Sequence, residues 1–310
     1  MSAQKNLYIL GHPIAHSKSP AMYNAVYARL GLPWRYGFAD LPTLEEAEAF
    51  LSARDFLSVN VTTPYKPAAF EAADVRAASA QLARGANVLV NKGGTLIAYN
   101  VDGQGCVGYL ERTGVRFSGK RVAVCGTGPT ALAILHAAAQ AGADEVVLVG
   151  RDKERASGVL RAYADAYRKL AEATVDLPAP QEHHLSFRAA YEHVSLKFGS
   201  YATSTQAIAA ADVIIDATPL GMHAGDPAPF DTGLLSARQV VFDVVYGHGT
   251  TALVAAARAA GCAAHDGAGM LVAQAVATFN IVCEVAGVDA ACGFDELFDV
   301  MADAAGFDAL

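Results

Sequence analysis

The stretch RVAVCGTGPTALAILHAAAQAGADEVVLVG, residues 121–150, decides the fold of much of this chain. It runs from a short apolar segment through a glycine turn into an alanine-rich helical segment and a second apolar segment. That order predicts a strand, a helix and a parallel strand joined by a right-handed crossover. Three more short apolar runs follow, DVIIDA, QVVFDV and CAAHD. We therefore expect residues 103–268 to form a doubly wound, Rossmann-type domain in a protein of the α/β class.

The glycine turn GTGPTALA, residues 126–133, has the spacing of a phosphate-binding loop. The first glycine permits a tight turn, the second lets the backbone approach a pyrophosphate, and the small Ala131 allows close packing of helix on strand. The glycines alone would be ordinary turn residues, but between a strand and a helix they predict nucleotide binding. The candidate residues are Gly126, Thr127, Gly128, Pro129, Thr130 and Ala131, with Pro129 suited to the first helical turn.

The end of the second strand, VGRDKERA, indicates which dinucleotide is bound. A carboxylate at this tip would bind the ribose hydroxyls of NAD, whereas here Gly150 is followed by Arg151, with Arg155 one turn later. Planar guanidinium groups suit a 2′-phosphate. We therefore expect NADP as the cofactor, and Asp152 keeps NAD open as an alternative.

Residues 152–200 form a long, polar, helix-prone stretch that is interrupted by DLPAPQEHH. We interpret it as an elongated crossover helix followed by a surface excursion. His183 and His184 lie in the excursion. Because no third or fourth ligand is spaced to join them, we predict a solvated loop and no metal site.

The remaining segments predict a second α/β domain. NLYIL and FLSVNVT are typical of strands, SPAMYNAVYARLG of a helix ending at Gly31, and VLVNKGGTLIAYN of a hairpin turning on Asn91–Gly94. Only helical patterns follow Gly267. We expect residues 1–102 plus 269–310 to form this second domain.

The composition narrows the choice of partners and location. The chain has 310 residues, is 53% hydrophobic and carries a net charge of −8, so no basic stripe is available for nucleic acid or an anionic membrane. No apolar run approaches the length of about 20 residues that a membrane helix needs, and no leader pattern is present, so we expect a cytoplasmic protein. The five cysteines lack metal-ligand spacing and are predicted to be buried, reduced thiols.

Polar residues follow several predicted strands, where sites in open sheets usually lie. They are Asn60, Thr62 and Lys66 in NVTTPYK, Asn87 in GANVLV, and Asn100 with Asp102 in YNVDGQG. A lone lysine after a turn is usually solvated and a lone aspartate before a helix is usually a cap, so neither is decisive by itself.

A pair of serines stands at the start of the first predicted helix, in GHPIAHSKSPAMYN. Ser19 before Pro20 has the pattern of an N-cap. The free N–H groups and the dipole at a helix N-terminus bind a carboxylate as well as a capping oxygen, so Ser17 and Ser19 are candidates for anion binding as well.

Six stretches occur in an order that resembles the shikimate dehydrogenase family: GHPIAHSKSPAMYN, NVTTPYK, NVDGQG, GTGPTALA, ATPLGM and DGAGMLVAQA. The resemblance covers the chain from residue 7 to about residue 285. It implies that the domain of residues 1–102 plus 269–310 is a substrate-binding domain for a polyhydroxylated cyclohexene carboxylate. It also implies that the Rossmann domain binds NADP and that a cleft lies between the two domains. The implied reaction is the reversible NADPH-dependent reduction of 3-dehydroshikimate to shikimate, a step of aromatic amino-acid biosynthesis.

The resemblance also implies roles for individual residues. Lys66 matches the catalytic lysine and Asp102 matches its partner. The lysine ammonium would stabilise and protonate the alkoxide formed from the substrate ketone. Thr218 and Gly267 match cofactor-binding positions. The residues that match substrate-binding positions are Ser17, Ser19, Asn60, Thr62, Asn87, Tyr246 and Gln274.

The chain departs from the family pattern in three places. Val88 follows Asn87 where threonine is usual, Asp152 follows Arg151 where threonine is usual, and His248 stands where a proline is usual. These departures weaken the assignment of Asn87 and the preference for NADP, and we expect His248 to lie in solvent.

Two other readings stay open. A quinate/shikimate dehydrogenase that uses NAD or NADP, or an aminoshikimate relative, would share these residues. A non-catalytic NADP-binding module would share the scaffold, but the presence of both Lys66 and Asp102 argues against it. The family resemblance is compatible with a monomer or a homodimer.

Overall fold

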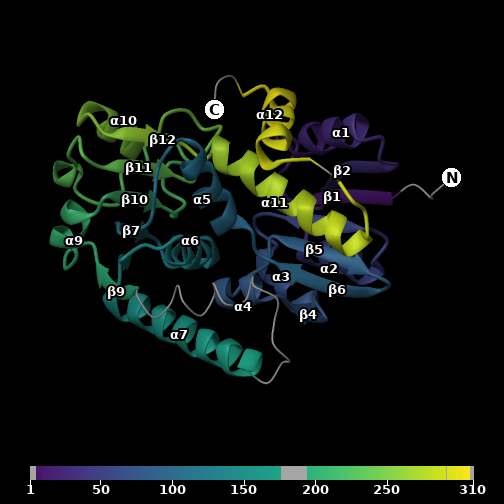
Figure 1. The fold of residues 1–310 in the computed structure, drawn as a ribbon, viewed down its shortest axis with the longest axis horizontal. Coiled ribbons are helices and arrows are strands. Elements are labelled where there is room, and N and C mark those ends of the chain that lie inside the picture. Colours follow the sequence, from purple (N-terminus) through teal and green to yellow (C-terminus); the bar gives the residue numbers. More distant parts are fainter. Residues whose placement is uncertain (1–4, 176–193, 291, 308–310) are drawn as a thin grey trace. The chain divides into compact units, whose positions relative to one another are not determined.

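The computed structural model describes residues 5–175, 194–290 and 292–307. The chain divides into two compact units, the first made of Met1–Gly105 with Leu271–Leu310 and the second of Cys106–Met270. The two boundaries fall within helices α5 (Asp102–Arg112) and α11 (Ala268–Ala286). The α/β class expected from the sequence is confirmed (Figure 1).

The first unit is built on a mixed sheet with the strand order β2-β1-β3-β5-β6-β4. The central strand β1 pairs in parallel with β2 and β3, while β3, β5 and β6 pair antiparallel. The predicted hairpin is present as β5 and β6, and it turns on Gly93 and Gly94, which both have positive φ. The strands are β1 (Lys5–Gly11), β2 (Trp34–Asp40), β3 (Ser58–Val61), β4 (Val75–Arg76), β5 (Val88–Lys92) and β6 (Thr95–Tyr99).

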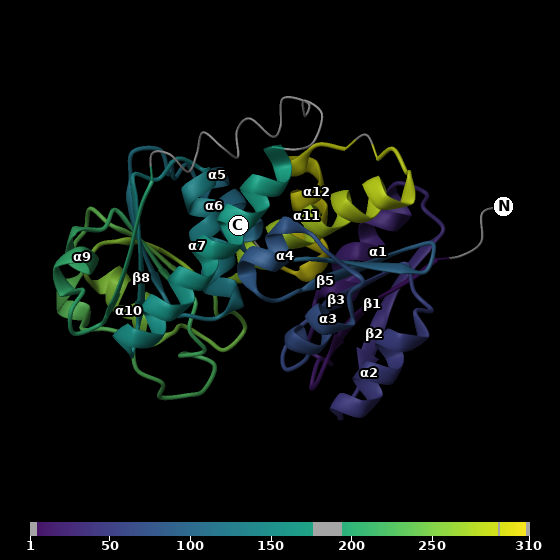
Figure 2. The same cartoon turned by 90° about the horizontal axis from the view of Figure 1, so that it is seen from below.

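Helices cover both faces of this sheet (Figure 2). Tyr23 of α1 stacks on Tyr36 on one face, whereas Phe50 of α2 meets Tyr8 on the other. Helix α2 begins with a capping box, in which Thr43 and the residue three positions later satisfy each other's backbone amides. The helices are α1 (Ser19–Arg29), α2 (Leu44–Ala53), α3 (Lys66–Ala72), α4 (Ala78–Ala83) and α12 (Phe294–Ala305).

The second unit is the expected Rossmann-type fold. Its six strands are all parallel, in the order β12-β11-β10-β7-β8-β9, so the strand order reverses between β7 and β10. Residues of α9 and α10 share one apolar cluster with the sheet. The elements are β7 (Arg121–Cys125), α6 (Pro129–Gln140), β8 (Glu145–Gly150), α7 (Lys153–Val175), β9 (Ser195–Ser200), α9 (Thr205–Ala210), β10 (Val213–Asp216), η2 (Thr232–Leu234), β11 (Val240–Asp243), α10 (Ala252–Ala259) and β12 (Ala263–His265).

The prediction for residues 152–200 is only partly right. The elongated helix is present as α7, but the expected surface excursion contains strand β9, which extends the sheet beside β8. The sequence SLKFGS carries only two large apolar residues because this strand lies at the edge of the sheet and is partly exposed. His183 and His184 lie outside the described residues.

Helix α11 is long and apolar enough to cross a membrane by length and composition alone, the one such helix in the described part of the chain. This corrects the expectation that no apolar run approaches that length. More than half of the helix is buried in this fold, as in the core helices of globular proteins.

Four cysteines are buried free thiols as expected, but Cys292 is partly exposed, which corrects the prediction for that residue. Within the described residues, no three histidine, cysteine or acidic side chains gather in a group that could hold a metal ion.

Candidate active site

A lysine and an aspartate from two helix starts meet in the first unit. Lys66 is the first residue of α3, the helix that follows β3, and Asp102 is the first residue of α5, the helix that follows β6. The Lys66 ammonium donates from Nζ to Asp102 Oδ2 at 2.9 Å. The Asp102 side chain is 8% exposed and that of Lys66 is 24% exposed, so a buried carboxylate holds a more accessible cation.

Asn87 completes the surroundings of this carboxylate. Its Nδ2 donates to Asp102 Oδ1 at 2.7 Å, and its Oδ1 accepts the backbone N–H of Val101 at 3.0 Å. Both carboxylate oxygens are therefore engaged, which fixes the plane of the Asp102 side chain. Asn100 has a different use, because its amide bonds the backbone of Gly85 and of Asp102 and so builds the turn.

The serine pair lies at the start of α1, but the prediction that Ser19 is the N-cap of this helix is wrong. Ser19 is the first helical residue and does not cap; the N-cap position is Lys18, without a side-chain cap. Instead Ser17 Oγ accepts the backbone N–H of Ser19 at 3.3 Å. The Ser19 side chain is thereby left free of capping, and the residue is buried.

The other predicted substrate residues of this unit lie on β3, its following loop and α11. Asn60 is buried and bonded to Tyr36 and Thr278. Thr62 is partly buried, with its backbone N–H bonded to Leu10. Gln274 is partly buried on α11.

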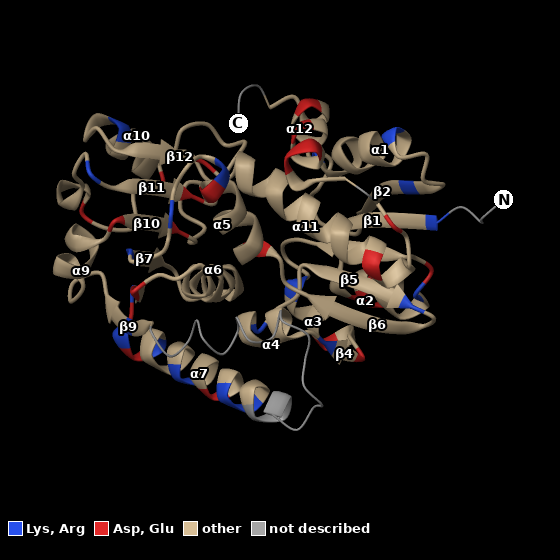
Figure 3. Ribbon diagram, in the orientation of Figure 1, with Lys and Arg blue, Asp and Glu red and all other residues tan. Residues whose placement is uncertain are grey.

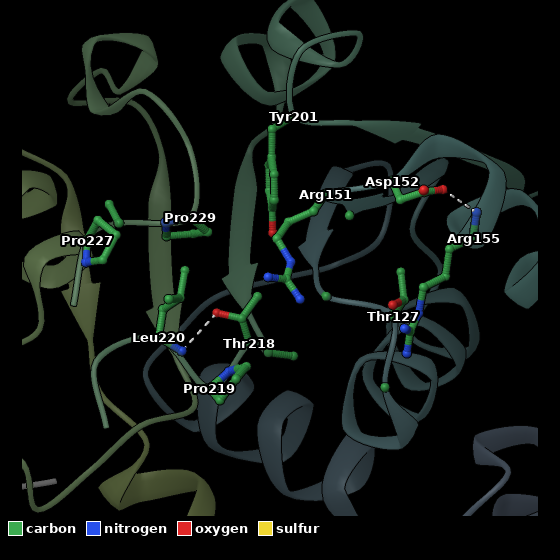
Figure 4. Close-up of a pocket in the computed structure, with 15 residues that line it drawn as sticks. Thr127, Arg151, Asp152, Arg155, Tyr201, Thr218, Pro219, Leu220, Pro227 and Pro229 are labelled. Atoms are coloured by element: carbon green, nitrogen blue, oxygen red, sulfur yellow. Dashed lines mark hydrogen bonds between the residues drawn. The ribbon is translucent and has the colours of Figure 1, made fainter. Parts of the chain in front are cut away.

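A pocket of about 940 Å³ opens in the second unit, where the strand order reverses (Figure 4). Gly126, Thr127 and Gly128 line it after β7. Gly126 has φ +114°, and a Cβ there would come within 2.9 Å of the Ala217 carbonyl oxygen, so this position needs glycine. Gly128 is extended and would leave a Cβ free of close neighbours.

The first turn of α6 supplies the rest of the predicted phosphate loop. Pro129 begins the helix, as expected for a residue without an amide hydrogen. Ala131 is fully buried, which fits its predicted role in close packing. Pro129, Thr130 and Ala131 are not among the residues that line the pocket.

Two arginines line the pocket at the end of β8. Arg151 and Arg155 are both exposed, and within the described residues neither forms an ion pair with an acidic side chain. Figure 4 shows the Arg151 guanidinium pointing toward Thr218 and that of Arg155 lying beside Thr127. Asp152 Oδ1 accepts the backbone N–H of Arg155 at 2.7 Å and so caps α7.

Several residues of this pocket were missed by the sequence analysis. Tyr201 lines it from the loop after β9, and because that strand was not predicted, no signal pointed to it. Burial raises the pKa of the Tyr201 hydroxyl. The others are Ala217, Pro219, Leu220, Pro227, Ala228 and Pro229. Prolines beside a nucleotide loop carry no distinctive sequence signal.

Asp216, at the end of β10, lies behind this pocket. Its Oδ1 accepts the Thr218 backbone N–H at 2.9 Å, while its Oδ2 is buried and has no hydrogen-bond partner in the described chain. Burial, and secondarily the nearby carboxylate of Asp243, raises the pKa of Asp216 to about 7.

Tyr246 and Gly267 lie outside the pocket residues. Tyr246 follows β11, and burial raises the pKa of its hydroxyl. Gly267 donates its N–H to the Val245 carbonyl at 3.1 Å, and an added Cβ would come within 2.1 Å of the Val244 carbonyl oxygen. Glycine is therefore required there by the neighbouring backbone.

The lysine–aspartate pair of the first unit, together with the pocket of the Rossmann-type second unit, defines a nicotinamide-dependent dehydrogenase of the two-unit kind. Residues 9–89 match the model of the shikimate dehydrogenase substrate binding domain. The chain belongs to the shikimate dehydrogenase family.

Two relatives support this assignment along most of their length. Shikimate dehydrogenase (NADP(+)) of Symbiobacterium thermophilum is 36% identical over 272 residues, covering 86% of this chain and 85% of that protein. The enzyme of the same description from Methanothermobacter thermautotrophicus is 34% identical over 303 residues, covering 96% and 94%.

Solved structures share the fold. Shikimate 5-dehydrogenase of Thermus thermophilus, in complex with NADP(H) and shikimate, has a TM-score of 0.75 at 24% identity and covers 97% of this chain and 99% of that one. The 5-ketofructose reductase of Gluconobacter sp. strain CHM43 has a TM-score of 0.72 at 25% identity and covers 98% and 99%. The same fold is thus found in proteins with different names.

Proposed function

We propose that this protein catalyses the reversible NADPH-dependent reduction of 3-dehydroshikimate to shikimate in aromatic amino-acid biosynthesis. The observation that carries the proposal is the Lys66 ammonium held at 2.9 Å by a buried carboxylate whose other oxygen is bound by Asn87. The named activity of the two relatives supports it. Residues 1–102 plus 269–310 would bind the substrate, and residues 103–268 the cofactor.

Lys66 is the proposed acid and base. NADPH, when bound, supplies the hydride. The Lys66 ammonium stabilises the negative charge that develops on the ketone oxygen and donates a proton to it, and in the reverse direction the amine accepts the proton of the hydroxyl. Asp102 directs the ammonium, because an N–H committed to Oδ2 fixes the directions of the other two.

The remaining polar residues would orient the substrate. A carboxylate at the N-terminus of α1 would accept from the Ser17 and Ser19 hydroxyls, aided by the helix dipole. Amide and hydroxyl groups would bind the ring hydroxyls. These groups come from Asn60, Thr62, Asn87, Tyr246 and Gln274.

The pocket of the second unit fits a phosphorylated dinucleotide. Gly126, Thr127 and Gly128 would meet the pyrophosphate beside the N-terminus of α6. Arg151 and Arg155 offer two guanidinium groups for the 2′-phosphate, and neither is neutralised by an acidic side chain of the described chain. This supports NADP over NAD.

Steady-state kinetics with shikimate and quinate, each with NADP and NAD, tests the proposal. We expect the highest kcat/KM with shikimate and NADP. A higher value with quinate, or with NAD, would favour the quinate dehydrogenase alternative. Tight NADP binding without turnover of either substrate would favour a non-catalytic module.

We further propose a cytoplasmic protein, monomeric or homodimeric, that binds neither nucleic acid nor membrane. Acidic residues are interspersed among the basic residues of the long helix α7 (Figure 3). Sedimentation velocity at micromolar concentration would give the oligomeric state.

A further inference from the structure

The side-chain amide of Asn60 is held at both ends. Tyr36 Oη donates to Asn60 Oδ1 at 2.8 Å, and Asn60 Nδ2 donates to Thr278 Oγ1 at 3.3 Å. A carbonyl oxygen can only accept and an amide nitrogen can only donate. In this arrangement the tyrosine hydroxyl donates in the first bond and the threonine hydroxyl accepts in the second, so both ends of the Asn60 amide are held.

The sheet register brings these side chains together. Strand β1 lies between β2 and β3, with Leu7 opposite Tyr36 and Ile9 opposite Asn60. Side chains two positions apart on β1 share a face, so Tyr36 and Asn60 lie on the same face of the sheet. Thr278 comes from α11, one helical turn after Gln274.

This group of side chains is fully enclosed. Tyr36 is 3%, Asn60 5% and Thr278 1% exposed. The Tyr23 ring stacks on that of Tyr36 at 4.4 Å between centroids, which keeps the phenol in place. In such surroundings water cannot replace a lost hydrogen bond, and an unpaired amide is costly.

The same tyrosine also reaches the serine pair. The Ser19 hydroxyl lies beside the Tyr36 hydroxyl and moderates the rise that burial causes in the pKa of that phenol. One phenolic group thus adjoins two residues, Ser19 and Asn60, that come from different elements.

We propose that Tyr36 and Thr278 are positioning residues that hold the Asn60 side-chain amide in place for its contact with the substrate. One N–H of the Asn60 amide is committed to Thr278, which leaves the second N–H to donate to an oxygen atom of the substrate. The inference rests on the proposed function for the identity of that oxygen, a ring hydroxyl or carboxylate of shikimate.

Kinetics of three conservative variants provide the first test. Tyr36→Phe and Thr278→Val each remove one hydroxyl and should raise KM for shikimate about three- to tenfold, the scale of one lost hydrogen bond, with kcat changed less than about twofold. Thr278→Ser keeps the hydroxyl and should restore the KM. KM for NADPH should not change in any variant.

Tyr27→Phe is the matched control. Tyr27 is a buried ring in the same aromatic cluster, 6.1 Å from Tyr23, but it makes no hydrogen bond to Asn60. It should leave KM for shikimate unchanged. An equal rise of KM in Tyr27→Phe would assign the effect to packing and overturn the inference.

A double-mutant cycle with Asn60→Ala tests whether the Tyr36 and Thr278 hydroxyls affect KM through the Asn60 amide. With the amide absent, Tyr36→Phe and Thr278→Val should produce no further rise in KM. The same fold-change in the presence and absence of the amide would overturn the proposal, because the two hydroxyls would then act independently of Asn60.

A readout without substrate separates this inference from the proposed function. The Asn60 side-chain amide protons, followed by ¹⁵N NMR in the unliganded protein, should exchange with solvent at least about threefold faster in Thr278→Val than in Thr278→Ser. Unchanged exchange overturns the inference. If wild-type protein fails to oxidise shikimate, the proposed function fails, and the exchange rates still decide whether the Asn60 amide is held.

Discussion

Lys66 donates its ammonium to Asp102 at 2.9 Å, although the two residues are 36 positions apart and open two different helices. The contact depends on β3 and β6, whose ends deliver the two side chains to the same edge of the sheet. Because Asn87 occupies the other carboxylate oxygen, Asp102 cannot rotate away from the lysine without breaking two hydrogen bonds. These hydrogen bonds hold the lysine–aspartate pair in one arrangement.

Replacing Lys66 by alanine should lower kcat about 10²-fold or more, the contribution of a positioned acid or base. Substrate and cofactor should still bind, because the other binding groups are untouched. Stopped turnover with retained binding, measured by kinetics and by calorimetric titration of shikimate and NADP, is the expected result. Near-normal turnover would contradict the assignment of Lys66.

Gly126→Ala and Gly128→Ala should separate fold stability from cofactor binding. Gly126→Ala places a Cβ within 2.9 Å of a carbonyl oxygen at φ +114° and should cost about 2 kcal/mol or more in the free energy of unfolding. Gly128→Ala meets no neighbour and should change stability by less than about 0.5 kcal/mol, yet raise KM for NADPH because the Cβ faces the pocket. Urea unfolding and kinetics measure the two effects. Equal destabilisation by both variants would contradict this reading.

Arg151→Ala should raise KM for NADPH about tenfold or more and leave KM for NADH within about twofold, since only the former cofactor carries a 2′-phosphate. Arg155→Ala should also raise the ratio of KM for NADPH to KM for NADH. Arg161→Ala is the control, because Arg161 is an exposed residue of α7 that does not line the pocket. A parallel rise of both KM values would show that the arginines serve the dinucleotide generally.

The strand–helix–strand unit of residues 121–150 was predictable because local spacing determines it: two apolar runs, a glycine turn and a helix of adequate length. Strand β9 was not, because an edge strand buries too little to show an apolar pattern, and Tyr201 was lost with it. Strand β2 was also not anticipated.

Single side-chain roles depended on contacts that local sequence does not encode. Asn87 and Asn100 both follow apolar runs and look alike, but only Asn87 bonds the Asp102 carboxylate with its side chain. The bond between Tyr36 and Asn60 requires that β1 lie between β2 and β3, and that strand order cannot be read from the segments themselves. Ser19 had the pattern of a cap, yet Ser17 bonds the helix amide.

His136 should make the protein sensitive to acid. It is buried on α6, 2.8 Å from the Tyr163 hydroxyl, and burial lowers its pKa to about 4 from an ordinary 6.5. The unfolded chain therefore binds a proton that the folded chain refuses, so stability is lost as the pH falls from about 6.5 to about 4, by about 3 kcal/mol. The free energy of unfolding, measured with urea, should fall with decreasing pH more steeply for wild type than for His136→Phe across this range. Parallel curves would contradict the prediction.

Asp216 should change the pH dependence of stability in the opposite direction to His136. Its pKa is raised to about 7 from 3.8, chiefly by burial, so the folded state holds a proton that the unfolded state releases. Its stabilising contribution is complete below about pH 4 and is lost as the pH rises through about 7. Asp216→Asn should therefore be more stable than wild type by an amount that grows with pH between 4 and 8, up to about 4 kcal/mol.

Asp243→Asn is the matched control for this last prediction. Its carboxylate also ends a neighbouring strand, but both oxygens have donors, the Val245 N–H at 3.0 Å and the Thr251 hydroxyl at 2.6 Å. Burial also raises the pKa of Asp243, and its charge contributes to the raised pKa of Asp216, so its replacement should lose hydrogen bonding and give a smaller gain with pH than Asp216→Asn. Because the His136 effect overlaps in pH with that of Asp216, each variant must be compared with wild type at the same pH. A constant difference between Asp216→Asn and wild type from pH 4 to pH 8 would mean that this carboxyl group titrates alike in the folded and unfolded states, and that its unpartnered oxygen carries no electrostatic cost.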